Sequence, residues 1–279
     1  MKITVIPNGN KFEAGALAQE VANRLSAEGT EVSLFKTSAP LPDAVSLCKA
    51  LANTDIAVAV GGDGTMVHVA KAAAAADCPV LGINAGRLGF LAGVEPDELE
   101  ALLPRLVSGD YAVDERMLLK VTISTENGEE VRYAMNEVVI SRGGLSRLVD
   151  VMVAADGDEV LSCRGDGVII ATPTGSTAYS LSAGGPVVDP SVDCLLLTPV
   201  CPHSLDSRPR IWPGWVKLTA QATAADNDPI YVTVDGEENL PLAPGQTVKI
   251  RRASMTARLL RLQDDSFYQR LSRKLTDRR

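Results

Sequence analysis

Aromatic residues and paired cysteines are scarce in this sequence. Phenylalanine, tryptophan and tyrosine make up 4% of the 279 residues, whereas hydrophobic residues of all kinds make up 46%, so aliphatic side chains must build the core. The odd number of cysteines and the absence of a Cys-x-x-Cys pair argue against a disulfide framework and a structural zinc site. The cysteines are Cys48, Cys78, Cys163, Cys194 and Cys201. This pattern predicts a reducing, cytoplasmic location.

Basic charge and long apolar runs are also lacking. The 35 acidic residues outnumber the 27 basic ones and give a net charge of −8, which argues against nucleic acid as a partner because a phosphate backbone attracts a basic surface. No apolar run approaches the ~18 residues that a membrane-spanning helix needs. The first residues reach Pro7 too soon for a secretory signal. We therefore expect neither nucleic acid nor a membrane as a partner.

Three common nucleotide-binding and catalytic motifs are missing. The sequence has no Gly-x-x-x-x-Gly-Lys P-loop, no Gly-x-Gly-x-x-Gly at the first predicted helix, and no Gly-x-Ser-x-Gly nucleophile turn. Its two histidines, His68 and His203, are far apart and lack the carboxylate spacing of a zinc site. Any phosphate chemistry must therefore use a different motif.

Strands and helices alternate over residues 1–112. Apolar segments predict strands at residues 2–6, 31–35, 56–60 and 79–83. Amphipathic or apolar periodic segments predict helices at residues 12–27, 42–52, 65–76 and 96–107. This alternation predicts a Rossmann-like parallel α/β domain, in which ligands bind beyond the carboxyl ends of the strands.

From residue 113 the pattern changes to short β-rich segments separated by turn sequences such as Asp156-Gly157 and Asp235-Gly236. The predicted strands are residues 117–124, 131–141, 148–155, 167–171, 194–199, 216–223, 229–235 and 246–251. Residues 113–252 are therefore predicted to form an antiparallel β-sandwich-like domain. Residues 253–279 end in a basic amphipathic stretch, which we expect to pack back on the α/β domain; a frayed end is the alternative.

The sequence Gly-Gly-Asp-Gly-Thr at residues 61–65 is the most informative segment of the α/β half. It follows a predicted buried strand and opens a predicted helix, so its backbone N–H groups and the helix dipole favour phosphate. A phosphate site normally avoids negative charge, yet Asp63 lies in the middle of this turn. A carboxylate there suits a base or a metal-linked group beside a transferring phosphoryl. The alternative is that Asp63 only caps the helix or shapes the turn.

Residues 164–186 form the second informative segment. An acidic Gly-x-Gly turn leads through an apolar strand into a small, hydroxyl-rich loop, which would let a ribose or a purine edge approach closely. The alternative is a β-bulge and a tight turn.

Two further polar groups are ambiguous. Asn136 and Glu137 suit ribose hydroxyls and amino groups, but neighbours in a strand point to opposite faces and reach one site only at an irregularity. A solvated face is the alternative. His68, one turn into the predicted helix, either reaches a phosphate or packs in the core.

Together these segments resemble the ATP-NAD kinase family, of the bacterial type. The matching segments are residues 61–65, 84–91, 136–137, 166–186 and 199–209, in the family's order. The first is shared with diacylglycerol, sphingosine and 6-phosphofructokinases. Residues 172–179, followed by Gly184-Gly185-Pro186, are what select NAD kinase.

The resemblance implies a kinase that transfers the γ-phosphate of ATP, or of polyphosphate in its place, to the 2′-hydroxyl of the adenosine ribose of NAD, giving NADP. Mg²⁺ or another divalent metal would be held mainly by the phosphates, and Asp63 would take the proton. The implied nucleotide-binding residues are Gly62, Asp63, Gly64, Thr65, His68, Phe90, Asn136, Glu137, Arg147, Arg164, Asp166, Thr177, Ala178, Tyr179, Ser180, Leu181 and Ser182. The resemblance also implies a homodimer or homotetramer. The alternatives are a lipid or sugar kinase with the same turn, or a dinucleotide sensor without turnover.

Overall fold

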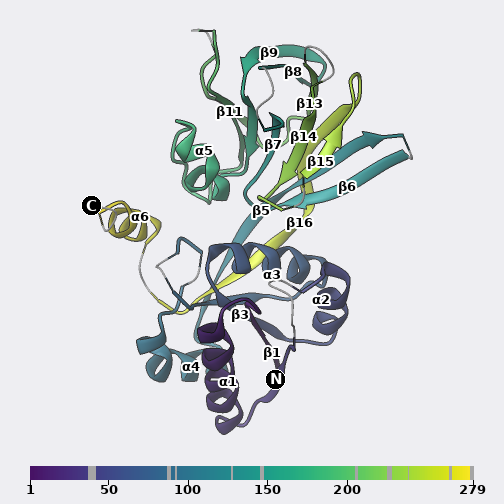
Figure 1. Cartoon of the computed structure of the whole chain (residues 1–279). Coiled ribbons are helices and arrows are strands. Elements are labelled where there is room, and N and C mark those ends of the chain that lie inside the picture. Colours follow the sequence, from purple (N-terminus) through teal and green to yellow (C-terminus); the bar gives the residue numbers. More distant parts are fainter. Residues whose placement is uncertain are drawn as a thin grey trace. The chain divides into compact units, whose positions relative to one another are not determined.

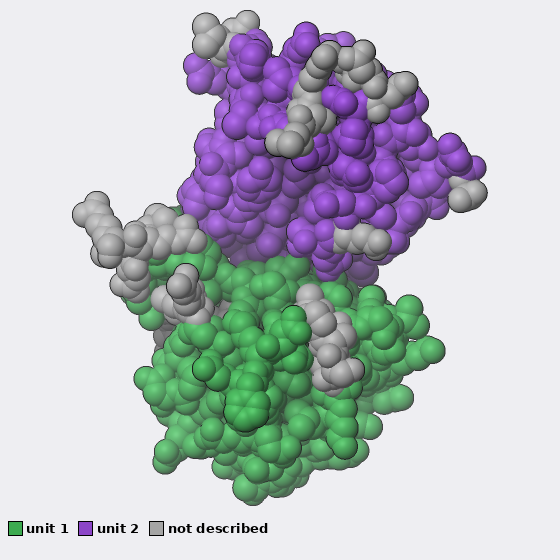
Figure 2. Space-filling view, in the orientation of Figure 1, with its two compact units in different colours: residues 1–115, 256–279 green, residues 116–255 purple. Residues whose placement is uncertain are grey.

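The structure, a computed structural model, describes residues 1–36, 42–86, 89–91, 93–126, 128–144, 148–204, 207–224, 228–237, 239–263 and 266–276 (Figure 1). The chain divides into two compact units (Figure 2). Unit 1 is Met1–Glu115 together with Thr256–Arg279, and unit 2 is Arg116–Met255. The sequence placed these divisions after residues 112 and 252, whereas the structure places them after 115 and 255. The difference arises because each division falls inside a long strand, the first in β5 (Ala112–Thr125) and the second in β16 (Thr247–Arg261).

Unit 1 contains the predicted parallel sheet. Its strands lie in the order β2-β1-β3-β4, all parallel, and β16 pairs with β4 through Leu259 and Val80. The strands are β1 (Lys2–Pro7), β2 (Glu31–Leu34), β3 (Ile56–Gly61) and β4 (Val80–Asn84). Every residue of β3 and β4 is buried, as expected of central strands with both faces covered.

The helices of unit 1 cover that sheet in two groups, because α1 contacts α4 and α2 contacts α3. These helices are α1 (Phe12–Ala27), α2 (Ala44–Leu51), α3 (Asp63–Ala75) and α4 (Leu99–Ser108), the last preceded by the short 3₁₀-helix η1 (Pro96–Glu98). Helix α1 has the predicted bounds and buries Ala14, Ala18, Val21 and Leu25 on one face. A final helix, α6 (Phe267–Thr276), belongs to unit 1, so the C-terminal segment returns to the α/β unit.

Unit 2 is a sandwich of two antiparallel sheets. One follows the order β16-β13-β8-β9, with the hairpin of β5 and β6 paired to β16; the other follows β12-β11-β10-β7-β14-β15. Their remaining strands are β6 (Gly128–Ala134), β7 (Glu137–Arg142), β8 (Val149–Ala155), β9 (Asp158–Gly165), β10 (Gly167–Ala171), β11 (Cys194–Val200), β12 (Arg210–Pro213), β13 (Leu218–Ala224), β14 (Ile230–Val234) and β15 (Asn239–Leu242). Alternate aliphatic residues of both sheets, such as Val138, Ile140, Val151 and Val153, form one shared core.

One strand prediction in this unit is wrong. The segment at residues 131–141 is not a single strand: β6 ends at Ala134, β7 begins at Glu137, and the two strands belong to different sheets. Met135 and Asn136 form the break between them. The sequence also missed β9, β12 and β15, and it ended the last strand at residue 251, whereas β16 continues to Arg261.

Helices of unit 2 are short. The hydroxyl-rich segment folds into the 3₁₀-helix η2 (Thr174–Thr177) and the single turn α5 (Tyr179–Ser182), which follow β10. No helix in the described part of the chain is both long and apolar enough to cross a membrane.

Candidate functional site

The carboxylate of Asp63 is held by the loop that follows β4. Helix α3 begins at Asp63, two positions before the predicted start at Thr65, so this side chain lies in the first helical turn. Its Oδ2 accepts a hydrogen bond of 2.8 Å from the backbone N–H of Phe90, and its Oδ1 accepts one of 3.0 Å from that of Leu91. A Cβ on Gly89 would lie 2.0 Å from Oδ1, so only glycine lets the loop close around the carboxylate. The predicted site residues Asp63 and Phe90 are thus brought together.

A lysine from the end of the chain completes the surroundings of Asp63. The Nζ atom of Lys274, on α6, lies 3.1 Å from Oδ2 of Asp63. The same atom lies 3.8 Å from the centroid of the Phe90 ring, and the Lys274 side chain is only 15% exposed. Sequence reasoning missed this residue, although it recognised the tail as basic.

The rest of the turn at residues 61–65 has space around its backbone. A Cβ on Gly62 or Gly64 would meet no heavy atom within 4 Å. Thr65 is buried, and its Oγ1 accepts a 2.9 Å hydrogen bond from the side chain of Asn8, which follows β1. The open glycines at the start of a helix favour the approach of an anion, whereas Thr65 links the turn to the neighbouring strand.

His68 faces a different part of unit 1. Its Nε2 lies 2.6 Å from the carbonyl oxygen of Pro42, just before α2. The structure therefore places this ring against the segment that leads into α2, and a phosphate contact by His68 stays a prediction.

In unit 2, the break between β6 and β7 is held open by Asp235. One carboxylate oxygen of Asp235 accepts a 2.8 Å hydrogen bond from the backbone N–H of Met135, and the other accepts bonds of 2.8 and 3.0 Å from Asn136 and Glu137. Asp235 itself lies in the turn after β14 with a φ of 51°. The sequence marked Asp235 only as turn chemistry; its role as an acceptor depends on residues far away along the chain.

Thr172 fixes the same break through the backbone carbonyl groups of Met135 and Asn136. Its backbone N–H donates to the Asn136 carbonyl at 2.8 Å, and its hydroxyl donates to that of Met135 at 2.6 Å. A Cβ on Gly175 would lie 2.1 Å from the Asn136 oxygen, so the hydroxyl-rich segment packs directly on the break. The irregularity that Asn136 and Glu137 need in order to serve one site is therefore present.

Glu137 is a buried carboxyl group. It is 6% exposed, and burial together with the nearby charge of Asp235 raises its pKa to about 8, although a hydrogen bond from the backbone N–H of Tyr179 opposes the rise. Within the described residues its Oε2 has no hydrogen-bond partner. At neutral pH Glu137 is mostly protonated, so it can donate a hydrogen bond as well as accept one.

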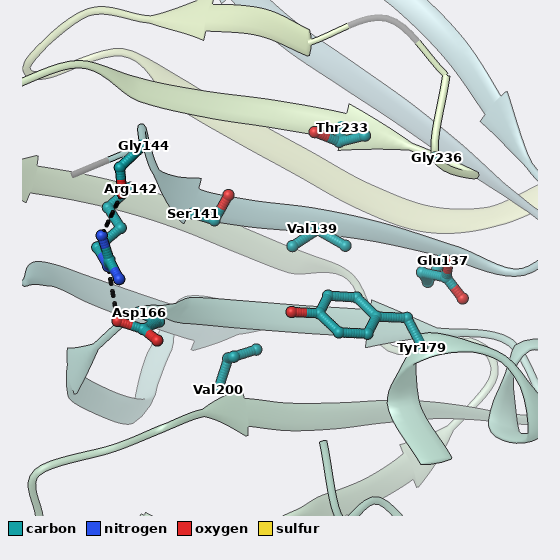
Figure 3. A pocket seen from close by; sticks show the side chains of 10 residues that line it. All are labelled: Glu137, Val139, Ser141, Arg142, Gly144, Asp166, Tyr179, Val200, Thr233 and Gly236. Carbon is teal, nitrogen blue, oxygen red and sulfur yellow. Dashed lines mark hydrogen bonds and ion pairs between the residues drawn. The ribbon is translucent and has the colours of Figure 1, made fainter. Parts of the chain in front are cut away.

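A pocket of about 450 Å³ lies on the outer face of the second sheet (Figure 3). Its lining residues are Glu137, Val139, Ser141, Arg142, Gly144, Asp166, Tyr179, Val200, Thr233 and Gly236. The alternation of β7 explains the lining, because Glu137, Val139 and Ser141 face the pocket while Val138 and Ile140 face the core. The ring of Tyr179 lies along the pocket, and the residue as a whole is 45% exposed, so a flat apolar surface is open to a ligand.

An ion pair closes one end of this pocket. Nε of Arg142 donates to Oδ1 of Asp166 at 2.6 Å (Figure 3). Asp166 lies between Gly165 and Gly167, where a Cβ would approach the carbonyl oxygens of Val200 and Ile140 to 2.8 and 2.2 Å. The Gly-x-Gly turn thus fits tightly between neighbouring strands and aims its acidic side chain at Arg142. Sequence reasoning missed Arg142, since nothing in its local sequence distinguishes it.

The other predicted site residues are distributed unevenly. The side chain of Arg164 is 62% exposed, and its Nε lies 4.0 Å from Oδ1 of Asp150. Arg164 does not line the pocket. Ser180 is buried, with its hydroxyl 2.9 Å from that of Thr198, so it stabilises the fold. Arg147 lies outside the described residues. The remaining members of the segment, Thr177, Ala178, Leu181 and Ser182, flank Tyr179 and are partly buried or exposed.

No three His, Cys, Asp or Glu side chains gather closely enough to hold a metal ion among the residues that the structure describes. The described site residues form two groups. Unit 1 has an acidic side chain, Asp63, with backbone N–H donors around it, and unit 2 has a polar pocket with an aromatic wall, Tyr179. The first suits a hydroxyl beside a phosphoryl group, and the second suits a nucleoside.

Comparison with family models gives two matches that together cover most of the chain. The ATP-NAD kinase N-terminal domain matches residues 3–111, and the ATP-NAD kinase C-terminal domain matches residues 135–262.

Individual proteins show the same similarity. An NAD kinase of Symbiobacterium thermophilum is 40% identical over 280 residues, covering 99% of both chains, and one of Heliobacterium modesticaldum is 38% identical over 282 residues, covering 98% of both. Among solved structures, the yeast NADH kinase complexed with NADH superposes with a TM-score of 0.84 at 23% identity, covering 99% of this chain and 88% of that one. An NAD kinase from Archaeoglobus fulgidus in complex with ATP superposes with a TM-score of 0.77 at 27% identity, covering 99% of each.

Proposed function

Because this chain belongs to the NAD kinase family, we propose that it phosphorylates NAD with ATP and releases NADP and ADP. The observation that carries the proposal within the chain is the carboxylate of Asp63. It stands in an open glycine turn at the start of α3, and its orientation is fixed by the N–H groups of Phe90 and Leu91. An oriented acceptor beside a phosphate-binding helix end is what the transfer to an alcohol requires.

The transfer is a single displacement. The oxygen of the 2′-hydroxyl of the adenosine ribose forms a bond to the γ-phosphorus, and the bond from that phosphorus to the bridging oxygen of ADP breaks. The proton of the hydroxyl passes to Asp63 and then to water. Since phosphoryl transfer proceeds through a loose transition state, the proton leaves late, and Asp63 orients the hydroxyl as much as it ionises it.

Mg²⁺, or another divalent metal, is part of the substrate in this proposal. It enters bound to the phosphates of ATP and neutralises their charge. The residues that would hold the triphosphate are Gly62, Gly64 and Thr65, of which the two glycines leave their backbone accessible.

Unit 2 is assigned the recognition of NAD. Tyr179 offers a stacking surface for the adenine, and Asn136 and the protonated Glu137 offer donors and acceptors for the adenine and the ribose. Asp166, held by Arg142, offers one further carboxylate to the dinucleotide. Contacts by Thr177, Ala178 and Ser182 belong to the same assignment.

The direct test is the incubation of the purified chain with ATP, Mg²⁺ and NAD, followed by detection of NADP with an NADP-specific dehydrogenase. Polyphosphate in place of ATP, and NADH in place of NAD, are run side by side. We expect NADP from the wild type, and from the Asp63→Asn variant a rate lower by about 10²–10⁴ with NAD binding retained. Asp97→Asn, an exposed acid in η1, is the matched control.

Two results would contradict the proposal. Binding of NAD without product would indicate a sensor, and phosphate transfer to a lipid or a sugar but not to NAD would indicate a different kinase. A cytoplasmic location and a homodimeric or homotetrameric state remain part of the proposal, the first supported by the five free thiols.

A further inference from the structure

We propose that Lys274 is a positioning residue for the transfer step, which binds one oxygen of the Asp63 carboxylate and supplies the positive charge that the turn at residues 61–65 lacks. This inference rests on the proposed kinase function and extends it to a helix that lies outside the matched family segments, which end at residue 262. The contact joins residues 211 positions apart.

The geometry around Lys274 differs from that of a surface ion pair. Its ammonium lies 3.1 Å from Oδ2 of Asp63 and 3.8 Å from the centroid of the Phe90 ring, and its side chain is 15% exposed. In the other described ion pairs of unit 1 the basic side chain is more exposed; Lys2, which pairs with Glu31, is 38% exposed, for example. A partly desolvated ammonium between a carboxylate and an aromatic face is strongly oriented.

The carboxylate does not need Lys274 in order to stay in place. Two backbone N–H groups already bind its oxygens, and an acidic side chain in the first turn of α3 is favoured by the helix dipole. The ammonium is the third donor to the carboxylate and the second to Oδ2, whereas Oδ1 accepts only the described bond from Leu91 and keeps a lone pair for another. Lys274 thereby directs one oxygen of Asp63 toward the incoming hydroxyl.

Charge gives the second reason. The segment at residues 61–65 carries one carboxylate and no basic side chain, so a triphosphate that approaches it meets a negative group. An ammonium beside that carboxylate offsets the repulsion and stabilises the negative charge that spreads over the transferring phosphoryl. The effect is largest in the transition state, so its loss lowers kcat more than it raises KM.

The test compares three variants with the wild type in the NADP assay. Lys274→Ala removes the positive charge and most of the side chain. Lys274→Met removes the charge but keeps the length of the side chain and its packing over Phe90. Lys274→Arg keeps the charge. Lys49→Ala, an exposed lysine on α2, is the matched control in the same unit. We expect kcat to fall about tenfold or more in the first two variants. The KM for NAD and the Tm should stay near the wild-type values, with partial activity in Lys274→Arg and full activity in the control.

Chemical rescue separates positioning from a merely structural role. Propylammonium replaces the atoms that Lys274→Ala removes, so it should restore turnover in a concentration-dependent way. Tetramethylammonium has the same charge but no N–H donor and should not restore it. If the alanine variant does not fold, Lys274→Met and Lys274→Arg decide the question, because they differ in charge at similar length.

Three outcomes would overturn the inference. A kcat that is unchanged in Lys274→Ala and Lys274→Met shows that the ammonium is not used. A kcat that rises shows that Lys274 blocks Asp63 in the resting chain. A loss of activity that follows the Tm and is not rescued by propylammonium shows a structural role. If the wild type itself makes no NADP, the proposed function fails instead, so the two failures are distinguishable.

Discussion

The carboxylate of Asp235 accepts a hydrogen bond of 2.8 Å from the backbone N–H of Asn136, 99 positions earlier in the chain. The same carboxylate binds the N–H groups of Met135 and Glu137, so a turn between two strands holds open the break between two others. Because these donors would otherwise lack partners at a strand end, Asp235 fixes the position of two residues that we assign to NAD binding.

Replacement of Asp235 by asparagine should therefore weaken both the fold and the binding of NAD. The amide can accept only with its oxygen, and its NH₂ group would face a backbone N–H donor. We expect the free energy of unfolding to fall by about 2 kcal/mol or more, and the KM for NAD to rise. Denaturant unfolding and the NADP assay measure the two effects.

The matched control for this variant is Asp156→Asn. Asp156 occupies an equivalent Asp-Gly turn, with a φ of 49°, and is exposed; its carboxylate accepts a 3.1 Å hydrogen bond from the backbone of Lys217. We expect the loss of this carboxylate to lower the free energy of unfolding only slightly. Equal destabilisation by the two variants would show that the turn, not the three-donor contact, is what matters at Asp235.

The closeness of Gly89 to Asp63 predicts a catalytic defect from a single methyl group. A Cβ at position 89 would lie 2.0 Å from Oδ1, so Gly89→Ala must displace the carboxylate or the loop. We expect kcat to fall about tenfold or more, because a small misplacement of a reacting group is costly. Gly93→Ala in the same loop is the control, since a Cβ there meets nothing within 4 Å. Similar kcat values for the two variants would contradict the described geometry.

Truncation of Asn136 should affect NAD more than ATP. The hydrogen bonds of Asn136 that the structure describes use its backbone, through Asp235 and Thr172, so Asn136→Ala leaves them intact. We expect a stability within about 1 kcal/mol of the wild type and a KM for NAD raised about tenfold by the loss of a polar contact. Steady-state kinetics with each substrate varied in turn provide the measurement, with the exposed Asn53→Ala as control. A larger rise in the KM for ATP than in the KM for NAD would contradict the assignment of Asn136 to NAD binding.

Much of the fold could be predicted from the sequence, because the signals for these elements lie within their own segments. Strands β3 and β4 are buried on both faces and read as continuous apolar runs, and the bounds of α1 follow from its own periodicity. The break at Met135 could not be predicted, because residues 131–141 have strand composition throughout and the groups that break the strand lie elsewhere. Asp235 and Thr172 are 100 and 37 positions away.

The residues of the candidate site likewise fall into those that could be predicted from the sequence and those that could not. Asp63, Asp166 and Tyr179 could be selected because they stand in segments with unusual composition, whereas Glu137, in a segment of ordinary strand composition, is selected only through the resemblance to the kinase family. Lys274 and Arg142 could not, because a basic residue in an amphipathic tail or at a strand end has no distinguishing neighbours; their partners, Asp63 and Asp166, are 211 and 24 positions away.

The buried carboxyl of Glu137 predicts a dependence of stability on pH. Its pKa is about 8 in the folded chain, against an ordinary value of 4.5. Between these values the unfolded chain binds fewer protons than the folded chain, so the free energy of unfolding falls as the pH rises, by up to about 1.4 kcal/mol per pH unit. The contribution of Glu137 to the free energy of unfolding is fully present below pH 4.5 and is lost by the time the pH passes 8.

Glutamine at position 137 cannot ionise and removes this contribution. We expect Glu137→Gln to match the wild type near pH 4, to exceed its stability at pH 8, and to show a smaller slope between them. Guanidinium unfolding at several pH values measures the slope, and Glu159→Gln, an exposed acid on β9, should leave it unchanged. Identical slopes for the wild type and Glu137→Gln would show that Glu137 is ionised in the folded chain.

Unit 1 is formed by two separate segments, Met1–Glu115 and Thr256–Arg279, and unit 2, Arg116–Met255, is inserted between them. A tether attached to the two termini would therefore load unit 1 directly, while unit 2 would carry tension only after unit 1 had been pulled apart. In a single-molecule stretching experiment the α/β unit should rupture first, and the extension released by the β-sandwich should appear as a later, separate event.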